Sequence, residues 1–387
     1  MRPNIDPTAQ SIEISGIRQF FNMVSDEQGV TSLTIGQPDF STPDHVKNAA
    51  KIALDTNQTT YTPNAGLMAL RTAISDFYER NYGVNYQPDS EVIVTSGASQ
   101  AIDIALRTIL TAGDDVLLPA PIYPGYEPSI KMNGAEPVHI DTTHDDFKLT
   151  KDHLKEHITS RTKCVVLPYP SNPTGASFTK EELANLVSVL KHENIFILAD
   201  EIYSELIYDQ EHTSIAQFED VKDRTIVING VSKSHAMTGF RIGYALAPEW
   251  LSKHMLKVHQ FNVSCASSIS QHAAIEALTN GLDDPIAMRD AYKQRRDYMY
   301  SRLKNMGLEV NKPDGAFYFF PAFPIDKSSF DFGLDLVQKG KVALVPGSSF
   351  SSIGEGYMRL SYAYHMSTIE EGLNRLESFL LKENMIS

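Results

Sequence analysis

Short apolar runs alternate with amphipathic segments through the middle of the chain. The apolar runs cover residues 91–95, 116–118, 163–167, 195–198 and 224–228. Helical spacing of apolar residues covers 100–110 and 181–191. Continuous runs of this kind, rich in β-branched residues and separated by helices, are typical of a mostly parallel sheet buried on both faces. The pattern therefore predicts an α/β fold.

The pattern changes near the C-terminal third of the chain. A long polar helix is predicted over residues 285–305, followed by apolar runs over 316–320, 342–345 and 358–361 with one helix between them. Residues 367–382 predict a last amphipathic helix, at whose start Ser367 and Glu370 resemble a capping box. We therefore expect a large α/β domain, 45–285, and a smaller α+β domain made of 1–44 and 286–387.

Length, charge and cysteine content narrow the class of protein. The chain has 387 residues, which favours two domains, and a formal net charge of -14, which argues against binding to nucleic acid. The two cysteines, Cys164 and Cys265, form neither a disulfide framework nor a zinc motif. We find no signal peptide and no apolar run long enough for a membrane helix. These features predict a cytoplasmic protein without a membrane partner.

Polar residues follow the predicted strands at the points where the strands end. The four segments are Thr95-Ser-Gly-Ala-Ser99, Asn172-Pro-Thr-Gly175, Asp200-Glu-Ile-Tyr203 and Ser232-Lys233-Ser234. Each segment alone is common as a turn, a helix cap or solvated surface. In open α/β sheets, however, ligands bind beyond the carboxyl ends of the strands, and a helix start there can hold a phosphate. Together the segments predict one site that holds a phosphate nest, an acid, a phenol, an amide and a lysine.

One longer motif resembles a known family. The segment Ser232-Lys-Ser-His-Ala-Met-Thr-Gly-Phe-Arg-Ile-Gly243 resembles the lysine motif of fold-type I, class I/II aminotransferases, which use pyridoxal 5'-phosphate (PLP). The resemblance extends from Ile35-Gly-Gln-Pro-Asp39 to Met358-Arg-Leu-Ser361. It implies an aspartate aminotransferase-like fold with a large PLP-binding domain and a smaller α+β domain. Tyr169-Pro-Ser-Asn-Pro-Thr-Gly175 and Asn262-Val-Ser-Cys-Ala-Ser-Ser268 further resemble the branch of N-acetyl-L,L-diaminopimelate and aromatic aminotransferases.

The resemblance implies a role for individual residues. Lys233 would carry the cofactor, Asp200 would pair with its ring nitrogen, and Tyr123 would stack on its ring. Asn172 and Tyr203 would donate to its phenolic oxygen. The residues that would hold its phosphate are Gly97, Ala98, Ser99, Ser232, Arg241 and, from the neighbouring subunit, Tyr61. Arg359 would bind the substrate α-carboxylate with Gly36 and Asn172. A homodimer with shared active sites is therefore expected.

The chemistry of the cofactor explains these residue types. PLP withdraws electrons from the substrate, and the protein supplies orientation and electrostatics. A carboxylate such as Asp200 favours the protonated ring nitrogen, because a nearby opposite charge stabilises the cation. Lys233 can move a proton at the α-carbon as general base and acid. The planar guanidinium of Arg359 suits a carboxylate because it can bind both oxygens.

Several functions share these residues. The leading hypothesis is transfer of an amino group between an amino acid and a 2-oxo acid, with glutamate and 2-oxoglutarate as one pair. The branch resemblance favours N-acetyl-L,L-diaminopimelate as the donor, in lysine biosynthesis. Aromatic or aspartate aminotransferase and PLP-dependent C–S β-lyase are alternatives, whereas a PLP-binding regulator would need a DNA-binding module. The segment from His153 to His157 matches an H-x-x-E-H zinc pattern, but we expect a solvated helix and no metal.

Overall fold

The centre of the molecule is a seven-stranded sheet with the order β2-β8-β7-β6-β5-β3-β4, in a computed structural model that describes residues 3–24 and 27–386. Its strands are β2 (Val92–Thr95), β3 (Asp115–Ala120), β4 (Glu136–Asp141), β5 (Thr162–Pro168), β6 (Phe196–Asp200), β7 (Thr225–Gly230) and β8 (Gly243–Leu246). Strand β8 is antiparallel to both of its neighbours, whereas β7, β6, β5, β3 and β4 pair in parallel. The predicted α/β fold with a mostly parallel sheet is confirmed.

Helices cover both faces of this sheet, because successive strand side chains point to opposite sides. On β5, Val165 and Leu167 belong to one hydrophobic cluster, whereas Cys164 and Val166 belong to another. The first cluster includes side chains of α4 (Met68–Tyr82), α8 (Lys180–Leu190) and α12 (Ser268–Thr279). The second includes side chains of α5 (Ala98–Ile109), α6 (Tyr126–Lys131) and α11 (Glu249–Val263). Burial on both faces explains why these strands read as continuous apolar runs.

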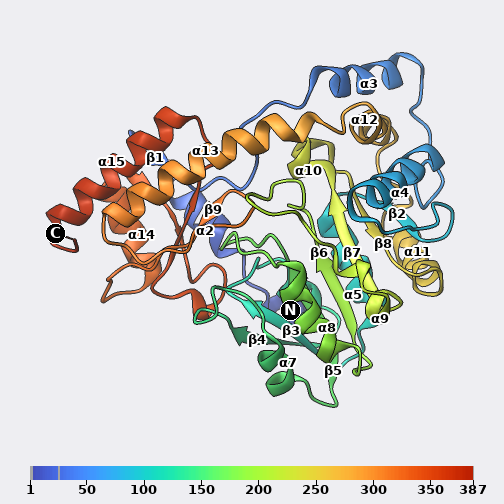
Figure 1. Cartoon of the computed structure of the whole chain (residues 1–387), viewed down its shortest axis with the longest axis horizontal. Helices are drawn as coiled ribbons and strands as arrows, with labels where there is room; N and C mark the ends of the chain where they lie inside the picture. The colour runs from blue at the N-terminus through green and yellow to red at the C-terminus, as the bar shows by residue number, and fades with distance from the viewer. Residues whose placement is uncertain (1–2, 25–26, 387) are drawn as a thin grey trace.

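The C-terminal part of the chain forms separate small sheets. Strands β9 (Tyr318–Phe319), β11 (Val345–Pro346) and β12 (Met358–Ser361) form a three-stranded sheet, and β1 (Thr31–Ser32) pairs in parallel with β10 (Val342–Ala343). Strands β9, β10 and β12 pack with α13 (Asp284–Asn305), α14 (Ser329–Gln338) and α15 (Met366–Lys382) in one hydrophobic cluster. Helix α13 runs from the neighbourhood of α12 to that of α15 (Figure 1). The residue boundaries of the two domains remain a prediction.

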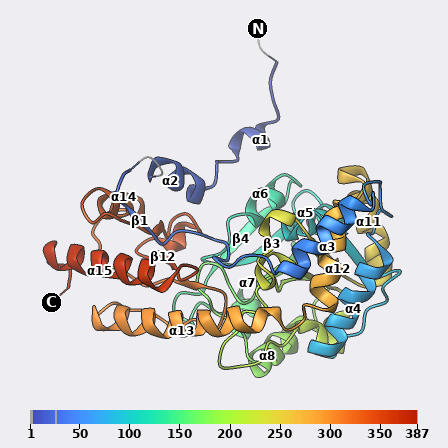
Figure 2. The same cartoon turned by 90° about the horizontal axis from the view of Figure 1, so that it is seen from above.

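The N-terminal segment runs along the C-terminal part. Helix α1 (Pro7–Ser11) stands away from the rest of the chain, whereas α2 (Gly16–Val24) lies beside α14 (Figure 2). Phe20 of α2 packs with Val337 and Ala343. The other helices are α3 (Asp44–Asp55), α7 (Lys151–His157), α9 (Glu219–Lys222), α10 (Val231–Ser234), η1 (Ile215–Gln217), η2 (Thr238–Phe240) and η3 (Ser352–Gly354). No helix within the described residues is long and apolar enough to cross a membrane.

Two predicted details are wrong. The run 342–345 is not one strand, because β10 pairs with β1 while β11 pairs with β12. The capping box at Ser367 is also absent, since α15 begins at Met366 and its N-cap is His365. The Nδ1 atom of His365 accepts the backbone N–H of Ser367 at 3.4 Å. Ser367 therefore lies inside the helix and receives a cap that another side chain supplies.

Candidate active site

A cavity of about 440 Å³ lies at the carboxyl ends of β5, β6 and β7. Asp200 is the last residue of β6, Asn172 follows β5, and Lys233 lies on α10 directly after β7. In-register pairing of β6 with both neighbours places these three strand ends side by side. The opposite wall comes from other parts of the chain: Thr34 to Gln37 after β1, Tyr318 and Arg359. Segments far apart in sequence thus enclose one site.

Lys233 is half-buried in this cavity. Its Nζ donates a hydrogen bond of 2.6 Å to the carbonyl oxygen of Gly36 and lies 5.7 Å from the ring centre of Tyr203. Burial, together with the positive charges of Arg359 and Arg241, lowers the pKa of Lys233 to about 8. A lysine with this pKa is partly neutral near physiological pH, so it can act as a nucleophile and as a base.

Asp200 is a buried carboxylate with polar partners. It accepts a hydrogen bond of 2.6 Å from the hydroxyl of Tyr126 and one of 3.2 Å from the backbone N–H of Ile202. Burial raises the pKa of Asp200 to about 6, although both hydrogen bonds act in the opposite direction. A cation beside it would restore the ionised form. The protonated ring nitrogen of PLP is such a cation, so Asp200 fits the predicted role.

The start of α5 forms a close cradle with Arg241. Gly97 precedes the helix with a φ of 80°, and a Cβ at this position would lie 2.3 Å from Nη2 of Arg241. A Cβ at Gly243 would lie 2.3 Å from the backbone nitrogen of Ala98. Glycine is thus required at both positions for the guanidinium and the helix start to approach. Free N–H groups at a helix start beside an arginine suit a phosphate, which is the anionic group of PLP.

Arg359 faces the cavity from the other wall. It is 2% exposed, and its guanidinium donates to Oδ1 of Asn172 at 2.9 Å and to the carbonyl oxygen of Thr34 at 2.7 Å. It lies 4.4 Å from the ring centre of Tyr318. Its Nε is buried without a hydrogen-bond partner in the described part of the chain. A buried arginine with such an unpaired donor is suited to bind the carboxylate of a substrate.

The structure brings most of the predicted site residues together. The cavity is lined by Gly36, Ala98, Ser99, Tyr123, Asn172, Asp200, Tyr203, Ser232, Lys233, Arg241 and Arg359. Gly97 adjoins it through Arg241. Tyr61 does not line the cavity: its side chain is 89% exposed on the surface. The individual roles of all these residues remain predictions.

Among the lining residues that the sequence did not predict, three contact the predicted ones directly. Tyr126 donates to Asp200, Tyr318 shares a hydrogen bond of 2.9 Å with Tyr203, and the carbonyl of Thr34 holds Arg359. Tyr318 lies in a run whose pattern indicates only a strand. Only the recurrence of tyrosine at 123 and 126, at helical spacing, could have indicated Tyr126. The carbonyl of Thr34 leaves no signal in a sequence.

The histidines of the zinc-like pattern stabilise their own helix. The backbone N–H of His153 donates to Oγ1 of Thr150 at 3.3 Å, and that of Thr150 donates to Nδ1 of His153 at 3.2 Å, which is a capping box. Nδ1 of His157 lies 2.9 Å from the carbonyl oxygen of His153. Both side chains are therefore engaged locally in α7.

Comparison with known proteins agrees with this geometry. A family model described as aminotransferase class I and II matches residues 28–376. A probable N-acetyl-LL-diaminopimelate aminotransferase of Bacillus subtilis is 58% identical over 380 residues, which cover 98% of this chain and 96% of the relative. The family match therefore includes every residue that lines the cavity from Thr34 to Arg359.

Two solved structures show the same architecture. An aromatic aminotransferase from Pyrococcus horikoshii is 38% identical with a TM-score of 0.90, covering 96% of this chain and 100% of that chain. An aspartate aminotransferase from Rhizobium meliloti is 34% identical with a TM-score of 0.93, covering 100% of both chains. Relatives with different named substrates thus share this fold over its full length.

Proposed function

The chain belongs to the aminotransferase class I and II family, and we propose that its amino donor is N-acetyl-L,L-diaminopimelate, with 2-oxoglutarate as the acceptor. The protein is a PLP-dependent aminotransferase. The observation that carries the choice of donor is the identity of 58% to the Bacillus subtilis relative of that name. On this proposal the reaction belongs to lysine biosynthesis and takes place in the cytoplasm, where the free cysteines Cys164 and Cys265 would stay reduced.

Some cavity residues would bind the cofactor, and others would bind the substrate. When bound, PLP supplies a conjugated ring that accepts the electrons released at the substrate α-carbon. Asp200 would hold the ring nitrogen in its protonated form, and Gly97, Ala98, Ser99, Ser232 and Arg241 would hold the phosphate. Tyr123 would stack on the ring, while Asn172 and Tyr203 would donate to its phenolic oxygen. This assignment gives a role to each polar segment at the strand ends.

The substrate would be held by the opposite wall. Arg359 would bind the α-carboxylate, oriented by the side chain of Asn172 and the carbonyl of Thr34. Lys233, whose pKa is lowered to about 8, would take the proton from the α-carbon and return it at C4′ of the cofactor. The carbonyl of Gly36 accepts a hydrogen bond from Lys233 and so fixes the direction of the amine.

A donor panel tests the proposed function. Purified holoenzyme would be assayed with 2-oxoglutarate and N-acetyl-L,L-diaminopimelate, glutamate, aspartate, phenylalanine or tyrosine as donor. We expect the highest kcat/KM for N-acetyl-L,L-diaminopimelate, and no transfer by the Lys233→Ala control. A higher kcat/KM for phenylalanine or tyrosine would make the protein an aromatic aminotransferase instead. Release of pyruvate and ammonia from a cysteine conjugate would identify a C–S β-lyase.

We also propose a homodimer whose subunits share their active sites. Tyr61 and Phe261 are aromatic residues with exposed fractions of 89% and 86%. Their segments adjoin, since Nδ2 of Asn64 donates to the carbonyl oxygen of Ser264 at 2.7 Å. Large aromatic side chains exposed on neighbouring segments are typical of a surface that another protein covers. A second copy would bring its Tyr61 to this chain's phosphate cradle.

A further inference from the structure

Tyr318 is a cavity residue to which the proposed function gives no role. Its side chain is fully buried and lines the cavity on the same wall as Arg359. Its hydroxyl oxygen lies 2.9 Å from that of Tyr203, which is a normal separation for a hydrogen bond between two hydroxyls. A Cβ added to Gly36 would lie 3.3 Å from the same hydroxyl. The phenol of Tyr318 therefore reaches from the wall assigned to the substrate to a residue assigned to the cofactor.

The ring of Tyr318 packs against the guanidinium of Arg359. The distance from the guanidinium carbon to the centre of the ring is 4.4 Å, within the range of a cation–π interaction. Burial raises the pKa of Tyr318, whereas the positive charge of Arg359 acts in the opposite direction. A positive charge beside a phenol favours loss of its proton, and so makes the hydroxyl a better hydrogen-bond donor. Arg359 therefore favours donation by Tyr318.

The supply of hydrogens at the two hydroxyls fixes the direction of their bond when the cofactor is bound. A tyrosine hydroxyl has one hydrogen to donate and two lone pairs that can accept. In the proposed function Tyr203 donates its hydrogen to the phenolic oxygen of PLP, so towards Tyr318 it can only accept. The result is a chain of two hydrogen bonds that ends at the cofactor, and bonds in such a chain polarise and strengthen one another.

We propose that Tyr318 is a positioning residue for the cofactor, which donates to Tyr203 and thereby strengthens the hydrogen bond from Tyr203 to the phenolic oxygen. This inference rests on the proposed function, because it requires Tyr203 to contact the cofactor, but it does not depend on which amino donor is used. A hydrogen bond donated to the phenolic oxygen stabilises its negative charge. A proton held beside that oxygen then leaves at a lower pH. The hydroxyl of Tyr318 therefore lowers the pH at which the bound cofactor loses this proton.

Removal of single hydroxyls tests the chain of hydrogen bonds. The absorbance of holoenzyme without substrate would be followed as the pH rises, and the midpoint of its change marks the loss of the cofactor proton. We expect Tyr203→Phe to raise the midpoint by roughly 1 to 2 pH units, since it removes a hydrogen bond to a charged oxygen. Tyr318→Phe should raise it by roughly 0.2 to 0.5 pH unit, because it weakens the same bond without removing it.

Two further variants make the comparison specific. A ring-fluorinated tyrosine in place of Tyr318 has a more acidic hydroxyl, so it should lower the midpoint, and it tests the same bond even if Tyr318→Phe does not fold. Tyr362→Phe is the matched control and should leave the midpoint unchanged. Tyr362 belongs to the same buried cluster, but it does not line the cavity and its hydroxyl donates to the carbonyl oxygen of Ala316 at 3.2 Å. The charged side chains that line the cavity are the same in every variant: Asp200, Lys233, Arg241 and Arg359.

A double variant distinguishes action through Tyr203 from a separate effect of Tyr318. In the Tyr203→Phe background, Tyr318→Phe should not move the midpoint further, since the hydroxyl through which it acts is gone. A further shift as large as in wild type would overturn the proposal, as would an unchanged or lowered midpoint in Tyr318→Phe alone. An unchanged midpoint in Tyr203→Phe would instead refute the role of Tyr203 in the proposed function, so the two failures are distinguishable.

Discussion

The contribution of Asp200 to the stability of the fold depends on whether the cofactor is bound. It is 6% exposed, and burial raises its pKa to about 6. In the protein without cofactor, the ionised carboxylate therefore destabilises the fold at neutral pH. This destabilisation is absent when the pH is below the ordinary carboxyl pKa. It grows as the pH rises from that value to about 6, and it has its full size above pH 6. The rise of this pKa from the ordinary carboxyl value to about 6 corresponds to roughly 3 kcal/mol of destabilisation as an upper limit.

The variant Asp200→Asn should relieve this destabilisation. The amide carries no charge; its oxygen can still accept the N–H of Ile202, and its NH2 can donate to the hydroxyl oxygen of Tyr126. We expect the variant apoenzyme to be more stable than wild-type apoenzyme at pH 8 by up to about 3 kcal/mol, and the difference to vanish near pH 4. Urea unfolding at several pH values measures it. Retention of PLP should fall in the same variant, whereas a pH-independent difference in stability would contradict the assignment.

Lys233 gives a second prediction at the residue scale. Its pKa, lowered to about 8 by burial, Arg359 and Arg241, makes the neutral amine increasingly available as pH rises through 8. The rate at which apoenzyme captures PLP should therefore rise with pH and level off above about 8. Arg359→Met removes one of the two positive charges, so the rise should move to higher pH. Absorbance of the bound cofactor follows the capture, with Lys233→Ala as the control.

An unchanged profile in Arg359→Met would show that the arginine does not act on the amine. Titration of the cofactor itself is common to both proteins, so it cancels when the variant is compared with wild type. The positive charge of Arg359 disfavours the protonated lysine, so its removal should raise the pKa of Lys233 in the protein without substrate.

At the scale of elements, His45 joins three helices. Its Nδ1 lies 2.9 Å from Oε1 of Glu276 on α12, and its Nε2 lies 2.9 Å from Oδ2 of Asp284 at the start of α13. Burial alone would lower the pKa of His45, but the hydrogen bonds to Glu276 and Asp284 raise it. The ion pairs therefore stabilise the fold fully below the ordinary histidine pKa, and this stabilisation is lost as pH rises through the folded value.

We expect His45→Gln to lower the free energy of unfolding by up to about 1 kcal/mol at pH 5.5 and by less at pH 8.5. The limit is small because the side chain is 39% exposed and solvent screens its charge. Denaturant unfolding at the two pH values measures the effect. His254→Gln on α11, where Nδ1 of His254 lies 3.2 Å from Nζ of Lys257 rather than from a carboxylate, is the control for the loss of an imidazole. A larger loss at the higher pH would contradict a role for the ion pairs.

The elements also show what a sequence can predict. Five strands of the central sheet, β2, β3, β5, β6 and β7, were predictable because burial on both faces leaves continuous apolar runs. Strands β4 and β8 were not predicted, and β4 lies at the edge of the sheet with only one fully buried residue. The ends of these strands carry Asn172, Asp200 and Lys233, so their convergence followed from parallel topology. The split at Leu344 was not predictable, since the partners of β10 and β11 are β1 and β12, far away in sequence.

The missed contacts of the site have the same physical origin. Tyr126 reaches Asp200 from helix α6, which follows β3, and the carbonyl of Thr34 reaches Arg359 across most of the chain. Neither contact has a local pattern, because a hydroxyl or a carbonyl gains its partner only through packing.

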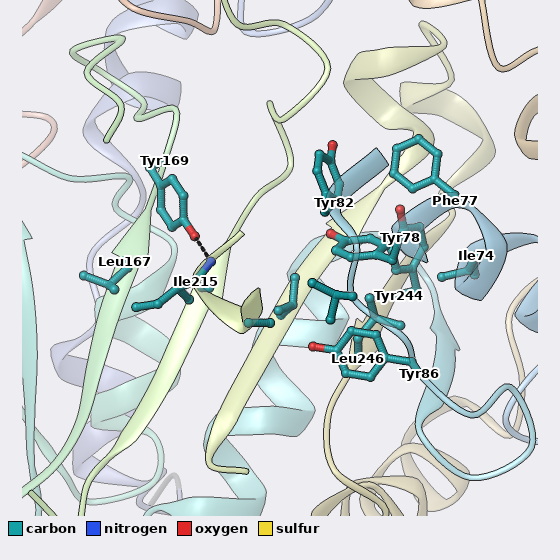
Figure 3. Close-up of a cluster of buried hydrophobic side chains, with 14 of the residues drawn as sticks. Ile74, Phe77, Tyr78, Tyr82, Tyr86, Leu167, Tyr169, Ile215, Tyr244 and Leu246 are labelled. Carbon is teal, nitrogen blue, oxygen red and sulfur yellow. Dashed lines mark hydrogen bonds between the residues drawn. The ribbon is translucent and has the colours of Figure 1, made fainter. Parts of the chain in front are cut away.

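A buried polar cluster around Glu201 is another contact that the sequence does not indicate. Glu201, beside Asp200, is fully buried and accepts hydrogen bonds from Tyr169 at 3.0 Å and Tyr78 at 3.2 Å. Tyr78 lies among aromatic side chains of the same core, and the hydroxyl of Tyr169 also accepts the backbone N–H of Ile215 (Figure 3). A sequence shows a pair of acids after a strand, but not that one faces the cavity and the other the core.

At the scale of the whole molecule, the phosphate cradle and Tyr61 lie apart. Arg241 and the start of α5 adjoin the cavity, whereas Tyr61 is exposed on a loop that packs against the segment after α11. Within one chain, then, Tyr61 does not line the cavity in which it is predicted to bind the phosphate. Two chains related by a two-fold axis would exchange these loops symmetrically, and each site would be complete only in the dimer.

Mixed dimers test this sharing. In a dimer of one Lys233→Ala subunit and one Tyr61→Ala subunit, the site that carries the Lys233→Ala change would also receive the Tyr61→Ala change from the other subunit. The second site would then contain an unchanged Lys233 and an unchanged Tyr61. After subunit exchange, half of the dimers are mixed, so activity should recover to roughly a quarter of wild type. Mixing Lys233→Ala with Asp200→Ala is the matched control, because both residues line the cavity of one chain and every mixed site stays defective. Recovery in the control, no recovery in the test, or a fully active monomer in sedimentation would each contradict shared sites.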